Sequence, residues 1–92
     1  MPVLGNDEIA TGLAGLAGWR HEHGAICKQF TFADFLGSVM FVNRITGAAE
    51  AASHHPDLGI SWNTVTVTLV THSEGGVTAA DLALAAQIEA LG

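Results

Sequence analysis

The change in hydrophobic period at Pro56 constrains the fold of this chain more than any other feature of its sequence. Before Pro56, apolar residues recur every three or four positions over about 33–53, which predicts a long helix with one buried face. These residues are Phe35, Val39, Val42, Ile45, Ala49 and Ala52. After Pro56, aliphatic residues alternate with threonine over 65–69, which predicts a strand with one buried face. Since the residue before a proline avoids helical geometry, the helix should end near Ser53 or His54.

The other segments repeat the same two patterns. Their expected order is a helix over 9–17, strands over 19–23 and 25–32, the long helix, strands over 58–62 and 65–70, and a helix that follows Thr78. Two hairpins that share a sheet, with helices on one face, bury the apolar side of every element. We therefore predict an α+β two-layer sandwich in the order α-β-β-α-β-β-α, with a four-stranded antiparallel sheet and three helices packed on one face. An edge strand would remain available for partners.

Side-chain caps should fix where the helices begin. Asn6 can cap the first helix, and the run Thr31 to Asp34 has the form of a capping box that opens the long one. Thr78 is the expected cap of the last helix, with Asp81 at the third position after it. Capping alone is a sufficient reason for a carboxylate at Asp81, so a functional role needs support from other residues.

Composition indicates one compact domain that associates with copies of itself. The chain has 92 residues, 49% hydrophobic and only 13% charged, which fits a single small core over 1–92 and is apolar for a monomer. Arg20, Lys28 and Arg44 oppose nine carboxylates, and the formal charge of −6 predicts no direct binding of nucleic acid or of an anionic membrane. Cys27 is the only cysteine, so no disulfide can form within the chain. The small size and apolar composition lead us to expect a homo-oligomer. Because no secretion signal or membrane-spanning run is present, we expect the protein to be cytoplasmic.

His54 and His55 stand side by side at the predicted end of the long helix. Histidine ordinarily titrates near neutral pH, so a pair of them at a chain reversal is a candidate proton-transfer site. Consecutive residues project in different directions, and we expect one of the pair to reach the reacting centre while the other orients a substrate. His72 comes from a separate element, at the end of the clearest strand, and should close on the same cleft.

Each of these residues also has an ordinary structural explanation. A His-His-Pro run can be a simple turn, and Glu50, one helical turn before His54, can form an exposed pair with it. Trp62 would give a planar ligand a flat apolar wall, although tryptophans more often lie in a core or an interface. The pattern alone therefore leaves both explanations open.

Metal binding is the less favoured chemical alternative. The possible ligands are His54, His55, His72, Asp81 and Glu50. Adjacent histidines rarely bind one tetrahedral ion together, and no Cys-x-x-Cys or His-Glu-x-x-His motif is present. No Gly-x-Ser-x-Gly elbow occurs either. The residues favour acid–base chemistry on a bound small molecule without a nucleotide cofactor, and the spacing argues only weakly against a metal.

The spacing of these residues resembles the dispersed motif of the pterin-4a-carbinolamine dehydratases, also called 4a-hydroxytetrahydrobiopterin dehydratases. That motif has an acidic residue, a His-His-Pro run, an aromatic residue, a histidine and an aspartate. In this chain they are Glu50, His54-His55-Pro56, Trp62, His72 and Asp81, separated by three, five, nine and eight residues. The resemblance covers nearly the whole chain and is strongest from Glu50 onward.

The resemblance implies dehydration of 4a-hydroxytetrahydrobiopterin to quinonoid dihydrobiopterin and water, a step that recycles tetrahydrobiopterin for an aromatic amino-acid hydroxylase. It implies acid–base catalysis by His54 and His72, with His55 sharing in proton transfer and in substrate binding. Asp81 would order the site. The remaining substrate-orienting residues would be Glu50, Pro56 and Trp62. The reaction needs no metal or redox cofactor, and which histidine donates the proton stays open.

The same resemblance implies a homodimer or a homotetramer. Some members of the family also act as a dimerisation cofactor for a homeodomain transcription factor, through surfaces that otherwise build the homo-oligomer. A non-catalytic protein-interaction module on the same fold is therefore the alternative function for this chain.

Overall fold

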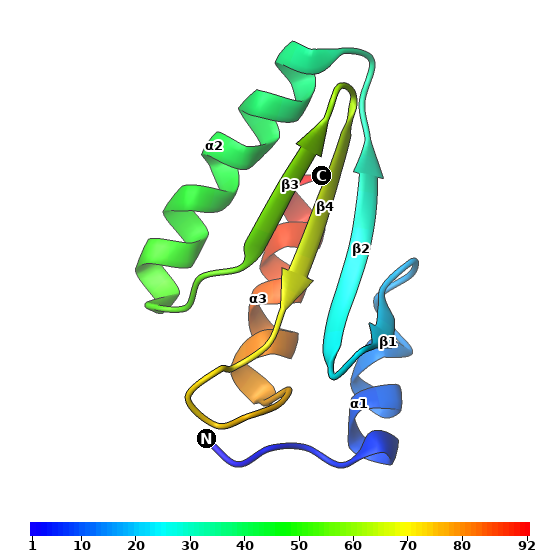
Figure 1. Ribbon diagram of the computed structural model, residues 1–92, viewed down its shortest axis with the longest axis vertical. Helices are drawn as coiled ribbons and strands as arrows, with labels where there is room; N and C mark the ends of the chain where they lie inside the picture. The colour runs from blue at the N-terminus through cyan, green and yellow to red at the C-terminus, as the bar shows by residue number, and fades with distance from the viewer.

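One antiparallel sheet of four strands carries three helices on one of its faces (Figure 1). The computed structural model describes residues 1–92. Its elements are α1 (Asn6–Leu13), β1 (Arg20–Glu22), β2 (Ala25–Thr31), α2 (Phe35–Ala52), β3 (Asp57–Ser61), β4 (Thr64–Leu69) and α3 (Ala79–Leu91), and the strand order is β1-β2-β4-β3. The predicted α+β fold and its order of elements are confirmed. None of the three helices combines the length and apolarity needed to cross a lipid bilayer.

The strand register places the alternating aliphatic residues of β4 on the covered face of the sheet. Val67 pairs with Lys28 of β2 on one side and with Leu58 of β3 on the other. Val65, Val67 and Leu69 are fully buried, whereas the threonines between them are only half-buried on the open face. Because a shift of one residue would exchange the two faces, this alternation fixes the register.

The core lies between the sheet and the helices and contains 13 buried residues. α2 contributes the side that carries Ser38, Phe41, Ile45 and Ala49. The predicted stripe was wrong at its ends, since Phe35 is 55% exposed and Ala52 is also exposed. Apolar residues occupy several sides of this helix, so periodicity alone allows more than one inner face.

Two helices begin differently from the prediction. Gly5, not Asn6, precedes the first turn of α1, and its N–H donates to Glu8 Oε1 at 2.9 Å. Asp34 caps α2 by accepting a backbone N–H of the first turn at 2.8 Å, while Thr31 remains the last residue of β2. In each case a carboxylate in or next to the first turn accepts a hydrogen bond from a backbone N–H there. N–H groups at a helix N-terminus have no partner within the helix.

α1 and β3 also end earlier in the sequence than predicted. α1 ends at Leu13, because Gly12 and Gly15 weaken the helical pattern beyond it. β3 ends at Ser61, and Trp62 turns the chain with a left-handed backbone (φ 51°). The Trp62 side chain is 67% exposed at this tip. A left-handed backbone is uncommon for tryptophan, so the sequence pattern predicted Trp62 inside the strand.

Lys28 interrupts the apolar pattern of β2 because it forms an ion pair at the margin of the core. Its Nζ lies 2.8 Å from Glu89 Oε1 of α3, and Trp19 Nε1 donates to the same oxygen at 2.8 Å. Partial burial raises the pKa of Glu89, but the hydrogen bonds from Lys28 and Trp19 and the charge of Lys28 outweigh it, so this pKa lies below its ordinary value. The pair links α3 to the sheet at the end of α3 remote from Asp81.

Candidate active site

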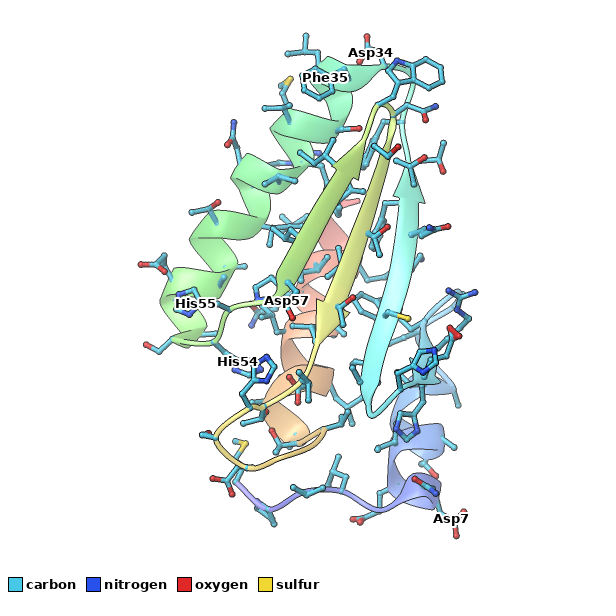
Figure 2. The ribbon with its side chains drawn as sticks, viewed as in Figure 1. Asp7, Asp34, Phe35, His54, His55 and Asp57 are labelled. Carbon is cyan, nitrogen blue, oxygen red and sulfur yellow. The ribbon has the colours of Figure 1, made fainter.

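The C-terminal end of α2 sends His54 and His55 in different directions. Ser53 has a left-handed backbone (φ 50°, ψ 38°), and its N–H donates to the Glu50 carbonyl at 3.2 Å. The His54 N–H donates to the Ala49 carbonyl at 3.1 Å. These two bonds form a Schellman motif with serine in the usual place of glycine. α2 ends at Ala52, one residue before the predicted end at Ser53 or His54. The side chains of His54 and His55, labelled in Figure 2, lie at this end of the helix. His54 is 16% exposed, while His55 is 65% exposed.

His54 is paired with Asp81 at the start of α3. The distance from His54 Nε2 to Asp81 Oδ1 is 2.5 Å, and the Asp81 side chain is fully buried. Burying a carboxylate is costly unless hydrogen-bond donors surround it. The imidazole N–H is one of these donors, so the contact fixes the ring of His54 and offsets the burial of Asp81.

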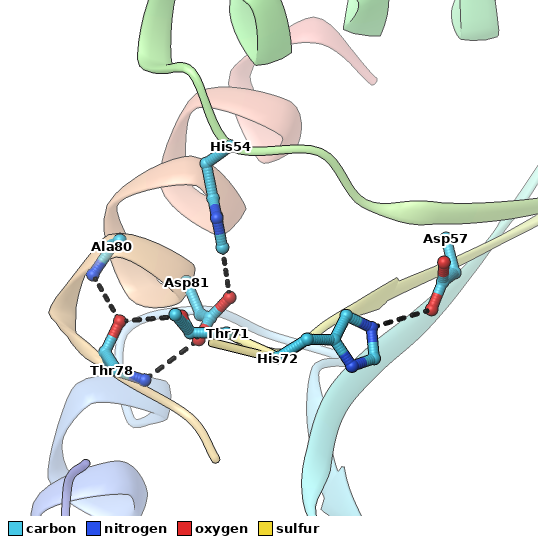
Figure 3. A network of polar contacts seen from close by, with 7 residues as sticks. All are labelled: His54, Asp57, Thr71, His72, Thr78, Ala80 and Asp81. Atoms are coloured by element: carbon cyan, nitrogen blue, oxygen red, sulfur yellow. Dashed lines mark hydrogen bonds and ion pairs between the residues drawn. The ribbon is translucent and has the colours of Figure 1, made fainter. Parts of the chain in front are cut away.

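Asp81 also holds the start of α3 in place. Its Oδ2 accepts from the Thr78 N–H at 2.9 Å and from the Thr71 hydroxyl at 2.8 Å (Figure 3). The Thr78 hydroxyl accepts from the Ala80 N–H at 3.2 Å, and the predicted capping box is confirmed. Asp81 thus caps the helix through one oxygen and contacts His54 through the other.

The second ring nitrogen of His54, Nδ1, is not fully enclosed by the protein. Nδ1 makes no hydrogen bond within the protein, yet no buried polar side-chain atom lacks a partner, so Nδ1 must reach the surface. An ionised carboxylate only accepts hydrogen bonds, which assigns the proton of the pair to Nε2. A neutral His54 therefore presents an Nδ1 lone pair outward. Such an atom can take a proton from a bound molecule and, once protonated, can return one.

His72 pairs with Asp57, a residue that the sequence analysis missed. Its Nε2 lies 3.9 Å from Asp57 Oδ2, and the two side chains are 80% and 72% exposed. Figure 3 shows the His72 ring turned toward Asp57 and away from Asp81. Each of the three imidazoles contacts a different carboxylate: His54 contacts Asp81, His55 contacts Glu50 and His72 contacts Asp57. The signal for Asp57 was the register of the β3–β4 hairpin, which pairs Asp57 with Thr68, four residues before His72.

His55 lies on the outer side of the helix end and pairs with Glu50. The distance from His55 Nε2 to Glu50 Oε2 is 2.5 Å, and the side chains are 65% and 69% exposed. Glu50 therefore contacts His55 and not His54, its neighbour one helical turn away. Pro56 is half-buried and leads from this pair into β3.

Trp62 lies far from the histidines within one chain. It occupies the tip of the β3–β4 hairpin, and the six residues of β4 separate it from the His72 loop by about 20 Å at ~3.3 Å per residue. Its carbonyl accepts from the Ser38 hydroxyl at 2.8 Å, which ties the tip to α2. The predicted site residues thus divide between the two ends of the sheet.

The His54–Asp81 and His72–Asp57 pairs border the same loop, the one that follows β4. Thr71 donates to Asp81, and His72 is the next residue of the chain. No three His, Cys, Asp or Glu side chains gather into a group that could hold a metal ion. What this end of the molecule offers is one imidazole oriented by a buried carboxylate, with a second, exposed imidazole beside the same loop.

Comparisons with known proteins relate the whole chain to one family. The model of the pterin 4 alpha carbinolamine dehydratase family matches residues 2–91. A protein of Thermosynechococcus vestitus that bears this family's name is 52% identical over 84 residues, which are 91% of this chain and 88% of the relative. A protein of Metallosphaera sedula with the same name is 47% identical over 99% of this chain and 95% of its own.

Solved structures agree with this relationship. A Brucella melitensis protein described as a transcriptional coactivator/pterin dehydratase superposes with a TM-score of 0.92 and is 36% identical, over 97% of both chains. A pterin dehydratase-like protein described as a RuBisCO assembly factor in the alpha-carboxysome shares the fold, with a TM-score of 0.69 and 23% identity over 83% of this chain and 90% of its own. The family model, the sequence relatives and the shared fold show that this chain belongs to the pterin 4 alpha carbinolamine dehydratase family.

Proposed function

We propose that this protein dehydrates 4a-hydroxytetrahydrobiopterin to quinonoid dihydrobiopterin and water by histidine general acid–base catalysis. The His54–Asp81 pair carries the proposal, because a buried carboxylate fixes one ring nitrogen and leaves the other at the surface. Membership of the family supports the pterin substrate. The protein would work in the cytoplasm, where it would recycle tetrahydrobiopterin for an aromatic amino-acid hydroxylase.

The proposed reaction needs two proton transfers and no electron transfer. A base removes the proton from N5 of the pterin ring, the N5–C4a double bond forms, and the C4a–O bond breaks. An acid donates a proton to the departing hydroxyl, which leaves as water. One acid and one base therefore complete the reaction, and it uses no metal and no redox cofactor.

His54 and His72 are the proposed acid–base pair. Nδ1 of His54 is directed outward by the contact with Asp81, and the exposed His72 can approach a ligand at the same loop. Each correctly placed acid or base contributes on the order of 10²- to 10⁴-fold to the rate. The side of the pterin that faces His54 decides which histidine is the acid.

His55 is the proposed substrate-binding residue with a share in proton transfer. Glu50 holds its ring, and Pro56 fixes the backbone that follows it. A substrate-orienting role for Trp62 requires a neighbouring copy that places the indole beside these histidines, because the hairpin keeps it at the other end of its own chain.

A stopped-flow assay of 4a-hydroxytetrahydrobiopterin decay tests the proposed activity. The wild-type protein should accelerate the decay, and His54→Gln and His72→Gln should each lose most of the acceleration. His23→Gln, in the turn between β1 and β2, is the matched control and should keep it. Decay no faster than in buffer would reject the proposal.

A homodimer or homotetramer is part of the proposal, because large apolar side chains are exposed along α2, β3 and the hairpin tip. They are Phe35, Leu36, Met40, Leu58, Ile60 and Trp62. β3 is also an edge strand, and association between copies would cover both features. Light scattering should give an oligomer mass, which Ile60→Lys should reduce and Gln29→Lys, on the open face, should not. A monomer mass for the wild type would contradict this.

A protein-interaction module is the second candidate function. The RuBisCO assembly factor shows that the same fold also occurs in a protein described by assembly rather than by catalysis, and the exposed apolar side chains offer a surface for a partner. Complementation by His54→Gln separates the two functions. An interaction module should keep its cellular role in this variant, whereas the dehydratase should lose it.

A further inference from the structure

A chain of hydrogen bonds runs from the first turn of α3 to the buried carboxylate beside His54. The Ala80 N–H donates to Thr78 Oγ1 at 3.2 Å, and the Thr78 and Thr71 hydroxyls lie 2.9 Å apart. The Thr71 hydroxyl then lies 2.8 Å from Asp81 Oδ2 (Figure 3). Thr78 and Asp81 are fully buried, and Thr71 is half-buried. Water is therefore not an alternative partner for most of the groups in this series of hydrogen bonds.

The donors in this chain can point in only one direction. An ionised Asp81 accepts hydrogen bonds and donates none, so the single proton of the Thr71 hydroxyl must point to Oδ2. Thr71 can then only accept from the Thr78 hydroxyl, which in turn accepts from the Ala80 N–H. Every donor is oriented toward Asp81, and each bond in such a chain polarises the next.

The backbone around Thr71 is fixed independently of this contact. Its N–H donates to the Gly76 carbonyl at 3.0 Å, and its carbonyl accepts from the N–H groups of Glu74 and Gly75 at 3.0 Å each. The loop therefore holds Thr71 with its side chain toward Asp81, while the next residue, His72, turns toward Asp57. Thr71 therefore adjoins both pairs: its hydroxyl contacts Asp81 of the first, and the next residue is His72 of the second.

We propose that Thr71 is a positioning residue whose hydroxyl fixes the Asp81 carboxylate, so that Oδ1 holds His54 Nε2–H and directs Nδ1 outward. Without this hydroxyl, Oδ2 keeps only the Thr78 N–H, and the carboxylate can rotate away from the imidazole. The consequence for catalysis rests on the proposed dehydratase function. The effect of Thr71 on the orientation of His54 holds whether or not the protein is a dehydratase.

Nuclear magnetic resonance of the His54 Nε2–H proton tests the inference without a substrate. Thr71→Val keeps the shape of threonine and removes the hydroxyl, and the exchange of this proton with water should become about tenfold faster, the effect of losing one hydrogen bond to a charged group. Thr71→Ser should restore the wild-type rate. Thr66→Val is the matched control on β4, where the only hydroxyl contact is a long one to Gln29 at 3.5 Å.

Kinetics gives the second readout. Thr71→Val should lower kcat about tenfold or more and leave KM unchanged, since the hydroxyl acts on the orientation of His54 and not on binding. An inactive wild type would reject the dehydratase function but leave the proton-exchange test intact. Wild-type proton exchange in a folded Thr71→Val protein would overturn the inference. If the valine variant does not fold, Thr71→Ala gives the same comparison.

Discussion

The His54–Asp81 pair and the His72–Asp57 pair border one loop, but water reaches them very differently. Asp81 is fully buried and 2.5 Å from its histidine, whereas Asp57 is 72% exposed and 3.9 Å from its own. A buried charge must keep all its partners, so the first pair has one arrangement. An exposed pair loses little when it separates, so the second can reorient.

The difference indicates a division of labour at the candidate site. His54 is held ready with one nitrogen committed to Asp81 and the other outward. His72 sits on a loop with glycines at 75 and 76 and has no buried partner, so a ligand can draw it in at small cost. One histidine is pre-organised, and the other is free to adapt to the bound molecule.

The largest expected effect is on activity. His54→Gln should lower kcat/KM by about 10²- to 10⁴-fold, because the substitution removes the Nδ1 atom that is proposed to transfer the proton. Asp57→Asn should change it by about threefold or less, since an exposed pair contributes little to position. Stopped-flow assays of both variants measure the ratio. Equal losses would mean that Asp57 matters as much to the reaction as the imidazole of His54 and would contradict the minor role of the exposed pair.

The next effect is on stability and compares the two pairs directly. A double-mutant cycle with His54→Ala and Asp81→Asn should give a coupling free energy of about 2 kcal/mol, the range for hydrogen bonds to buried charges. The same cycle with His72→Ala and Asp57→Asn should give no more than about 0.5 kcal/mol. Urea unfolding of the four variants of each cycle measures both. Similar couplings would remove the distinction between the pairs.

The Lys28–Glu89 ion pair lies outside the candidate site, and its burial is intermediate between those of the two histidine pairs. Glu89→Gln should cost about 1 kcal/mol of unfolding free energy without lowering activity. The pKa of Glu89 is lowered in the folded protein, so the unfolded chain binds this proton more readily. The stabilisation should be complete above the ordinary glutamate pKa of about 4.3 and should decline as the pH falls below it. Urea unfolding between pH 6 and pH 3 measures this, and an unchanged pH dependence in Glu89→Gln would contradict the assignment.

The smallest effect concerns Ser53, the residue that precedes the two neighbouring histidines. Ser53 has a left-handed backbone that glycine adopts without strain, so Ser53→Gly should raise the unfolding free energy by about 0.5 kcal/mol. The directions of His54 and His55 should not change, and activity should stay within about twofold of the wild type because His54 remains tied to Asp81. A loss of stability would show that the serine side chain has a role beyond its backbone conformation.

Local patterns predicted the elements better than the surfaces they present. The alternation in β4 and the Thr78–Asp81 capping box could be read from neighbouring residues, because each depends on contacts within a few positions. The inner face of α2 could not, since the exposed Phe35 and the buried Phe41 both fit a helical period. Only the packing against the sheet and α3 distinguishes them.

The site shows the same limit at longer range. The spacing of the histidines and Asp81 placed them in one motif, but the contact between His54 and Asp81 joins residues 27 positions apart. Asp57 was missed because an aspartate after a proline is also an ordinary turn residue. The rotation of His72 toward it depends on how the loop after β4 closes, which no local pattern specifies.

The double use of Asp81 has a consequence for how related genes should be interpreted. A duplicated copy that had abandoned its chemistry would still need this carboxylate, because α3 begins on its hydrogen bonds with Thr78 and Thr71. Folding therefore preserves Asp81 whether or not the copy is active. The imidazole of His54 could be replaced there by an amide donor without disturbing the helix start. Among descendants of this gene, the residue at position 54 is the better indicator of whether the ancestral reaction survives.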